Sequence, residues 1–86
     1  MSKVNFNNIE QVLKRKAVGR STLYGEIRSG KFPKPISLGT RKIAWPEHEI
    51  DQMMQLYLHS PTEEEMRDFV KSLEAKRLVG GVANVV

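Results

Sequence analysis

The sequence has no cysteine, only four prolines and no long apolar run. The absence of cysteine excludes disulfides, thiolate zinc sites and a cysteine nucleophile. The scarcity of proline, together with 40% apolar and 28% charged residues, is typical of a folded domain and not of a disordered tail. No segment approaches the roughly 18 apolar residues of a membrane span, and the N-terminal segment lacks the apolar middle of a signal peptide. We therefore expect a cytoplasmic protein without membrane contact.

The chain is also short, with 86 residues. A domain of this size buries only about 60% of the surface that its unfolded chain exposes, so every element has to contribute to one core. Most enzymes are larger than this.

Positive charge is concentrated in the first half of the sequence. Residues 1–45 carry ten Lys and Arg against two Glu, whereas residues 46–86 carry four Lys and Arg against eight acidic residues. The net charges of the halves are therefore +8 and −4, which give the total of +4. This asymmetry favours a first half that meets a polyanion and a second half that turns away from it. The alternative is a solvated surface of uneven charge.

The spacing of apolar residues predicts two short helices near the N-terminus. The first spans residues 8–16, with Asn7 or Asn8 as its N-cap. The second spans residues 20–29 and ends at Gly30, a favourable C-terminal residue. Its outward face carries small, polar and basic residues, which are Ser21, Gly25 and Arg28.

A β-hairpin is predicted after these helices. Two prolines in residues 31–35 forbid helix and require an extended path. Residues 36–38 and 43–45 alternate between apolar and polar side chains around a turn at Gly39–Lys42, as the two strands of a hairpin do. The side chains expected to face the core are Ile36, Leu38, Ile43 and Trp45.

Two further helices are predicted in the second half. Pro46 fits the first position of the third helix, and Ser60–Glu63 has the pattern of a capping box at the start of the fourth. Gly80–Gly81 is expected to stop the fourth helix, which leaves a flexible tail over residues 80–86. The apolar stripes are Ile50, Met53, Met54, Tyr57 and Leu58 in the third helix and Met66, Phe69, Val70 and Leu73 in the fourth.

The patterns that would indicate an enzyme or a metal site are incomplete. Residues 25–31 have the spacing of a phosphate-binding loop, but Phe32 stands where Ser or Thr would hold magnesium, and no βαβ unit surrounds the loop. His48 and His59 are too few and too poorly spaced for a zinc site, and both are expected at the surface or at its boundary. The acidic run at residues 63–65 is interpreted as a solvated first helical turn. We expect no enzymatic activity, no metal, no cofactor and no small-molecule substrate.

The remaining pattern is two helices joined by a tight turn, followed by a hairpin with a basic tip. The major groove of DNA is about 12 Å wide and admits one helix. A helix with hydroxyl and Arg side chains near its N-terminus offers donors to phosphates and bases, and its dipole favours phosphate. A basic hairpin tip suits the adjacent backbone or minor groove.

Three motifs in this region resemble the AlpA family of phage regulators, which are related to excisionase and MerR-type winged helix-turn-helix domains. They are R-S-T-L-Y at residues 20–24, G-x-F-P-x-P at residues 30–35 and L-G-x-R at residues 38–41, within a resemblance over residues 9–58. The resemblance implies a mainly α fold with a small β-hairpin wing, to which this chain adds a C-terminal helix. It also implies a DNA-binding transcription regulator or a recombination directionality factor, which bends attachment-site DNA so that an integrase excises a mobile element.

The resemblance also implies roles for individual residues. Leu23, Ile27, Phe32, Trp45 and Ile50 match core positions of the family. The implied DNA-binding residues are Arg20, Ser21, Thr22, Tyr24 and Arg28 in the recognition helix, Lys34 before the wing, and Thr40, Arg41 and Lys42 in the wing.

Two glycines depart from the family pattern. Gly19 stands where the turn usually has Ser, so the recognition helix has a weaker cap, although glycine gives the turn conformational freedom. Gly25 stands where Arg is frequent, which removes a DNA contact or lets the backbone approach the groove.

Alternatives to DNA contact stay open for most of the implied site. Tyr24 is expected either in the core or at the DNA, and Arg28 either at a phosphate or beside a carboxylate. Ser21 and Thr22 could serve only as helix caps, and Arg41 and Lys42 only as a soluble turn.

The sequence thus predicts a winged helix-turn-helix domain over residues 1–60, a C-terminal helix over residues 61–79 that packs on it or mediates self-association, and the tail 80–86. The favoured function is sequence-specific binding of double-stranded DNA as an excisionase for a mobile element, with an integrase and further copies of the chain as candidate partners. One alternative is an activator of an integrase or prophage gene. Another is a protein-interaction module that acts through the C-terminal helix, with Phe69 and Leu73 as its contacts.

Overall fold

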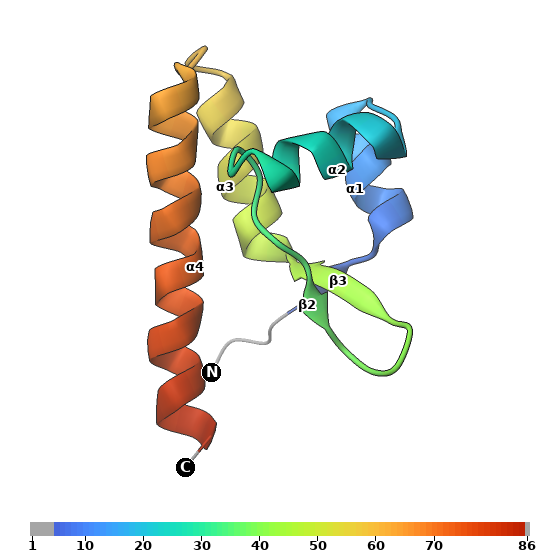
Figure 1. Cartoon of the computed structure of the whole chain (residues 1–86), viewed down its shortest axis with the longest axis vertical. Helices are drawn as coiled ribbons and strands as arrows, with labels where there is room; N and C mark the ends of the chain where they lie inside the picture. Colours follow the sequence, from blue (N-terminus) through green and yellow to red (C-terminus); the bar gives the residue numbers. More distant parts are fainter. Residues whose placement is uncertain (1–4, 86) are drawn as a thin grey trace.

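The computed structural model describes the backbone of residues 5–85 and the side chains of residues 5–77. It is mainly helical with a small antiparallel sheet, which confirms the predicted fold class (Figure 1). No helix within residues 5–85 is long and apolar enough to cross a membrane. In chain order the elements are β1 (Phe6–Asn7), α1 (Ile9–Lys16), α2 (Arg20–Arg28), β2 (Ile36–Ser37), β3 (Ile43–Pro46), α3 (Glu47–Tyr57) and α4 (Glu63–Val85).

The described sheet has the strand order β1-β3-β2 and is antiparallel throughout. Ile36 lies opposite Ala44 in the predicted hairpin, and Asn7 of β1 lies opposite Trp45 on the other side of β3. The sequence did not predict β1, because its 2 residues are too short to show an alternating pattern. The strand ties the N-terminal segment to the centre of the domain.

Both ends of α1 are fixed by local hydrogen bonds. Asn8 is the N-cap, and its side chain and that of Gln11 bind each other's backbone N–H at 2.9 and 2.8 Å. At the other end Ala17 has φ 59°, in the left-handed region, whereas Gly19 has φ −90°. The turn therefore does not use the conformational freedom of Gly19, and its left-handed residue is Ala17. The left-handed residue has to follow the last turn of α1 directly in order to close it, and that position is Ala17.

The core joins both halves of the chain. The Trp45 indole N–H donates to the carbonyl of Pro33 at 2.8 Å, and the Trp45 ring meets Phe32 edge-on with centroids 6.1 Å apart. Ile27 is only partly buried, whereas the other positions matched to the family core are fully buried. The core cluster consists of Val12, Leu23, Phe32, Trp45, Ile50, Met53, Val70 and Leu73.

Two residues expected in the core are exposed. Leu38 has 43% of its surface exposed and Leu58 has 76%. Leu38 lies beyond the paired part of β2, where the hairpin projects away from the helices (Figure 1). Leu58 is the C-cap of α3 and lies at the exposed end of that helix.

The start of α4 lies two residues later than predicted. Its capping box is formed by Thr62 and Glu65, which bind each other's backbone N–H groups, and not by Ser60 and Glu63. Ser60 has φ 49° and belongs to the preceding turn. The helical backbone continues past Gly80–Gly81, because glycine lowers helix propensity by about 1 kcal/mol without removing the N–H group.

The predicted tail, residues 80–86, lies outside the residues whose side chains the structure describes. Its flexibility and the predicted domain boundaries therefore stay predictions.

A buried ion pair attaches α4 to the rest of the domain. The Glu49 carboxylate is 1% exposed and accepts from both Nε and an Nη of Arg77, the first at 2.8 Å. Arg77 also donates to the carbonyl of Lys34 at 2.7 Å, and Glu74 accepts from the N–H of Lys34 at 2.8 Å. α4 is thus joined to α3 and to the segment before β2. The sequence pattern did not indicate this pair, because it placed Glu49 in the first turn of a helix, where an acidic residue is normally exposed.

Candidate nucleic-acid interface

The outward face of α2 carries five of the predicted contact residues. Leu23 is fully buried and fixes the rotation of the helix. Arg20, Ser21, Thr22 and Arg28 are exposed, and Tyr24 is 37% exposed, so Tyr24 is not a core residue. The N-cap Gly19 makes no side-chain hydrogen bond to α2, as the sequence predicted from the missing Ser. The first N–H groups of α2 therefore have no side-chain acceptor from the cap.

The hairpin loop carries three more of these residues. Thr40, Arg41 and Lys42 are all exposed. The loop has its own hydrogen bonds, since the N–H of Leu38 donates to the carbonyl of Lys42 at 2.7 Å and the Ser37 hydroxyl donates to the carbonyl of Gly39 at 3.0 Å. The basic side chains are thus held on a projecting turn with a defined backbone.

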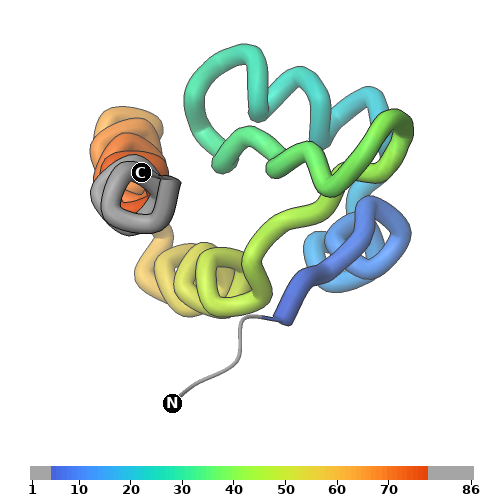
Figure 2. Tube along the Cα trace, turned by 90° about the horizontal axis from the view of Figure 1, so that it is seen from below, coloured from blue at the N-terminus to red at the C-terminus, as the bar shows by residue number. Residues whose placement is uncertain are grey.

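The structure brings two groups of the predicted residues to one side of the molecule. The N-terminal end of α2 and the β2–β3 loop both lie on the side far from α4 (Figures 1 and 2). Arg28 and Lys34 lie at the opposite end of α2, where they line a pocket against α4. The nine predicted residues therefore do not form one compact patch, but extend along α2 from the hairpin loop toward α4.

Ion pairs neutralise part of the basic first half. Four of its basic residues form ion pairs with carboxylates; they are Arg15, Lys16, Arg20 and Lys31. The net charge of +8 therefore overstates the positive charge that is available to a polyanion. Arg20 pairs with Glu10, and both side chains stay more than half exposed. Within residues 5–77, the remaining basic residues of the predicted site have no carboxylate partner; they are Arg28, Lys34, Arg41 and Lys42.

Lys16 has a structural role that the sequence did not indicate. Its side chain is 5% exposed, and its ammonium lies 3.0 Å from the Glu26 carboxylate and 2.7 Å from the Tyr57 hydroxyl. The same ammonium lies 4.9 Å from the ring centroid of Phe32 and 4.3 Å from that of Tyr57. Burial raises the pKa of Tyr57, and the hydrogen bond from Lys16 offsets part of this rise. Lys16 therefore connects α1 with α2 and α3 and is not available to bind a polyanion.

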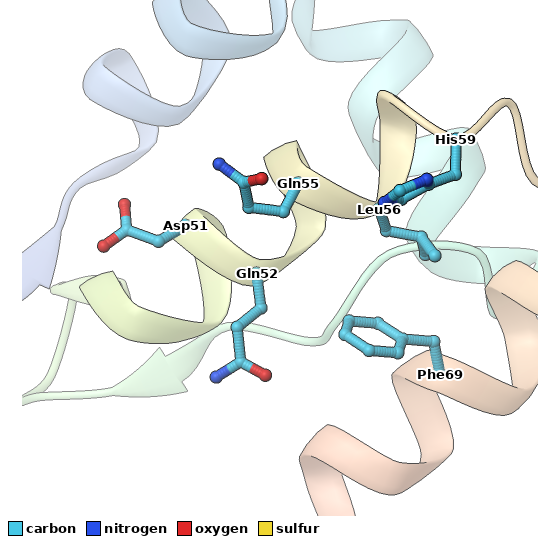
Figure 3. Close-up of a pocket in the computed structure, with 6 residues that line it drawn as sticks. All are labelled: Asp51, Gln52, Gln55, Leu56, His59 and Phe69. Atoms are coloured by element: carbon cyan, nitrogen blue, oxygen red, sulfur yellow. The ribbon is translucent and has the colours of Figure 1, made fainter.

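A second surface bears on the predicted protein-interaction module. A pocket of about 330 Å³ lies between α3 and α4, where Phe69 of α4 lies near Leu56 of α3 and near His59, which follows that helix (Figure 3). Leu73, the other predicted interaction residue, is 3% exposed and belongs to the core. Phe69 is only partly buried, so this surface offers one of the two predicted contacts to a partner.

The two histidines are exposed at positions 48 and 59, in agreement with the surface positions predicted for them. In the part of the chain that the structure describes, no group of three or more His, Asp and Glu residues could hold a metal ion.

Comparison with known proteins identifies relatives of phage origin. The family model described as "Prophage CP4-57 regulatory protein (AlpA)" matches residues 6–58, which extend from β1 to just beyond α3 and exclude α4. "Uncharacterized protein ORF88" of Enterobacteria phage P4 is 37% identical over 49 residues, which cover 57% of this chain and 56% of that protein. The chain thus matches little more than half the length of this relative. No solved structure matches the chain.

Proposed function

This chain belongs to the AlpA family of prophage regulatory proteins, and on this premise we propose that it binds particular sequences of double-stranded DNA. The observation that supports this most is the arrangement of α2 and the hairpin loop. An exposed helix face with hydroxyl and Arg side chains lies on the same side as a projecting loop with unpaired Arg and Lys. α2 would enter the major groove, and the loop would lie over the adjacent backbone or minor groove.

The proposed DNA contacts divide into two kinds. Side chains at the N-terminal part of α2 reach base edges and the nearest phosphates, whereas the basic loop and the end of α2 contact phosphates only. Neutral hydroxyl groups with exposed Arg suit the first task, and unpaired cations suit the second. The proposed residues are Arg20, Ser21, Thr22, Tyr24, Arg28, Lys34, Thr40, Arg41 and Lys42.

For the biological output we propose an excisionase, or recombination directionality factor, of a mobile element in a bacterium. The family model and the matching phage protein support a regulator carried by such an element. A module of this size binds a small part of the duplex, so several copies on repeated sites would supply both affinity and a bend. An integrase and further copies of this chain are accordingly the proposed partners, on DNA in the bacterial cytoplasm.

An activator of an integrase or prophage gene is the closest competing output. It needs the same DNA-binding surface, and a protein that bends DNA beside an attachment site also affects a nearby promoter. The two outputs differ in the position of the bound sites and in the effect on excision.

The purified protein should first be used to select fragments of the host genome at about 150 mM salt, close to physiological ionic strength. Retained fragments with repeated sites beside an integrase gene or attachment region are the result expected of an excisionase. Sites confined to promoters would favour the activator, and no enrichment over random DNA would contradict sequence-specific binding.

Excision should then be measured with the matching integrase on a plasmid that carries the two attachment sites. Addition of this protein should raise the yield of the excised circle. If excision is unchanged while the adjacent promoter is activated, the excisionase role is wrong and the activator role is supported.

The protein-interaction module has one observation in its favour, the apolar pocket beside Phe69. If the chain is such a module, Phe69→Ala should abolish capture of the partner protein. The wild-type protein should then bind DNA weakly and with little dependence on the DNA sequence. Tight and selective DNA binding by both wild type and Phe69→Ala would contradict this reading.

A further inference from the structure

A second basic surface lies where α2 ends against α4. A pocket of about 350 Å³ is lined there by the C-terminal end of α2, the segment that follows it and one face of α4. Four of the lining side chains are cationic, and Glu74 alone among them is acidic. The cationic residues are Arg28 and Lys34 from the first half of the chain and Arg67 and Lys71 from α4.

The contacts within this pocket leave most of its positive charge uncompensated. Glu74 already accepts from the backbone N–H of Lys34 at 2.8 Å. Within residues 5–77, no carboxylate forms an ion pair with the side chains of Arg28, Lys34 or Lys71. Several cations on one concave surface produce a concentrated positive potential, which attracts an anion.

Arg67 is held at the edge of this pocket by contacts with its neighbours. Its Nε donates to the carbonyl of Ser29 at 2.9 Å, at the C-terminal end of α2. One of its Nη atoms lies 3.6 Å from the Glu63 carboxylate, one helical turn earlier in α4. Gly30, with φ 80°, lets the chain leave α2 directly beside the Arg67 side chain. Arg67 therefore fixes the position of α4 against α2 and places the pocket at the end of the proposed recognition helix.

The position of the pocket relative to the proposed DNA surface indicates what the anion is. α2 runs from the side of the molecule that carries the β2–β3 loop toward α4 (Figures 1 and 2). Arg28 ends α2 and also lines the pocket, so the pocket continues the outward face of this helix. A duplex that receives α2 in its major groove has a phosphate backbone along each edge of that groove.

We propose that this pocket binds a phosphate of the DNA backbone, with Lys71 of α4 as a contact that neither the sequence patterns nor the family match assigns. The proposal rests on the proposed function, since it requires α2 in the groove. The hairpin loop then contacts the backbone on one side and α4 contacts it on the other. The second half of the chain thus takes part in DNA binding, although its net negative charge predicted that it turns away.

Lys71→Ala provides the test, because Lys71 is exposed and has no ion pair in the described residues. The matched control is Lys76→Ala, which removes the same charge from the same helix at an exposed position outside the pocket. Arg67 is unsuitable because its loss would also disturb the end of α2. Thermal unfolding should show that both variants keep the wild-type fold.

The measurement is the affinity for a duplex retained in the genomic selection, by fluorescence anisotropy at several salt concentrations. Lys71→Ala should bind about 3- to 10-fold more weakly, and its slope of log K against log salt should be smaller by about 1, as expected for one lost phosphate contact. Lys76→Ala should behave as wild type. A duplex series with single neutral methylphosphonates should contain one position that weakens wild type and leaves Lys71→Ala unchanged.

Equal affinity of Lys71→Ala and wild type at every salt concentration would overturn the proposal. Equal losses in Lys71→Ala and Lys76→Ala would also overturn it, because they would reflect net charge alone. In both cases the proposed function would stay supported if wild type binds the duplex and Arg41→Ala binds it more weakly. Failure of wild type to bind any duplex would instead overturn the proposed function, and this inference with it.

Discussion

At the scale of single residues, Ala17 has a backbone conformation that is costly for any residue with a Cβ atom. Its φ of 59° lies in the left-handed region, where the Cβ approaches the following carbonyl at a cost of roughly 1–2 kcal/mol. Glycine avoids this cost but loses more freedom on folding. Ala17→Gly should therefore raise the free energy of unfolding by about 0.5–1 kcal/mol, visible as a melting temperature about 4 °C higher in thermal unfolding.

Ala75→Gly is the matched control for this prediction. Ala75 is exposed within α4, where glycine has no such advantage, so the same substitution should lower stability by about 1 kcal/mol. If Ala17→Gly lowers the melting temperature as much as Ala75→Gly does, the strain assigned to Ala17 is absent.

The basic residues of the proposed site make a second prediction at this scale. Arg28→Ala and Arg41→Ala should each weaken DNA binding by about 1–2 kcal/mol, because each removes an exposed cation without an ion pair in the described residues, for which we propose a phosphate contact. Neither should change the melting temperature by more than a degree or two, since neither side chain packs in the core. Anisotropy titrations beside thermal unfolding measure both effects. Unchanged binding in both variants would contradict the assignment of these residues.

At the scale of the elements, the Glu49–Arg77 pair is one of the contacts that attach α4 to the domain. Arg77→Met should destabilise the protein by about 3 kcal/mol, because it leaves the carboxylate of Glu49, 1% exposed, without its charged partner. Urea unfolding measures this free energy directly.

A double variant separates the unpaired charge from lost packing. Glu49→Leu combined with Arg77→Met removes both charges and should recover most of the lost stability. If the double variant is no more stable than Arg77→Met alone, the lost hydrogen bond to Lys34 or lost side-chain packing explains the effect.

Most helices could be predicted from the sequence because their signals are local. Asn8 precedes an apolar spacing of 3 and 4 residues, and Gly30 ends α2 with the positive φ for which glycine is suited. The elements that were missed depend on distant partners. β1 forms only because β3 offers it an edge, and Glu49 is buried only because Arg77 approaches from α4. Pairings between distant segments cannot be predicted from a local sequence pattern.

The candidate site was predictable to a similar extent. The motif at residues 20–24 and the basic turn at Arg41 indicated which side chains to consider, and their exposure agrees with a surface role. The pairing of Arg20 with Glu10 and the burial of Lys16 could not be read from charge counts, because ion pairs depend on which helices become neighbours. The basic pocket beside Lys71 combines segments from both halves, so no window of sequence contains it.

At the scale of the whole molecule, the distribution of unpaired cations predicts how DNA binding responds to salt. These cations lie at the hairpin loop, at the end of α2 and in the pocket beside α4. About four or five phosphate contacts should give a slope of log K against log salt of roughly −4. Titrations between about 50 and 200 mM salt measure this slope. A slope near zero would show that the basic surface does not face the DNA backbone.

The pairing of Phe6 with Pro46 has a consequence for how the protein is made. About forty residues separate these partners, and at 5–20 residues per second the ribosome needs roughly 2–8 s to add them. β1 is therefore synthesised before β3, and it cannot form until that strand has been added. Glu49 also waits, although for a shorter stretch, because Arg77 follows it by 28 residues. A nascent chain thus contains the proposed DNA-binding elements before the contacts that hold them in place exist, and the domain cannot complete its fold until Arg77 has been added.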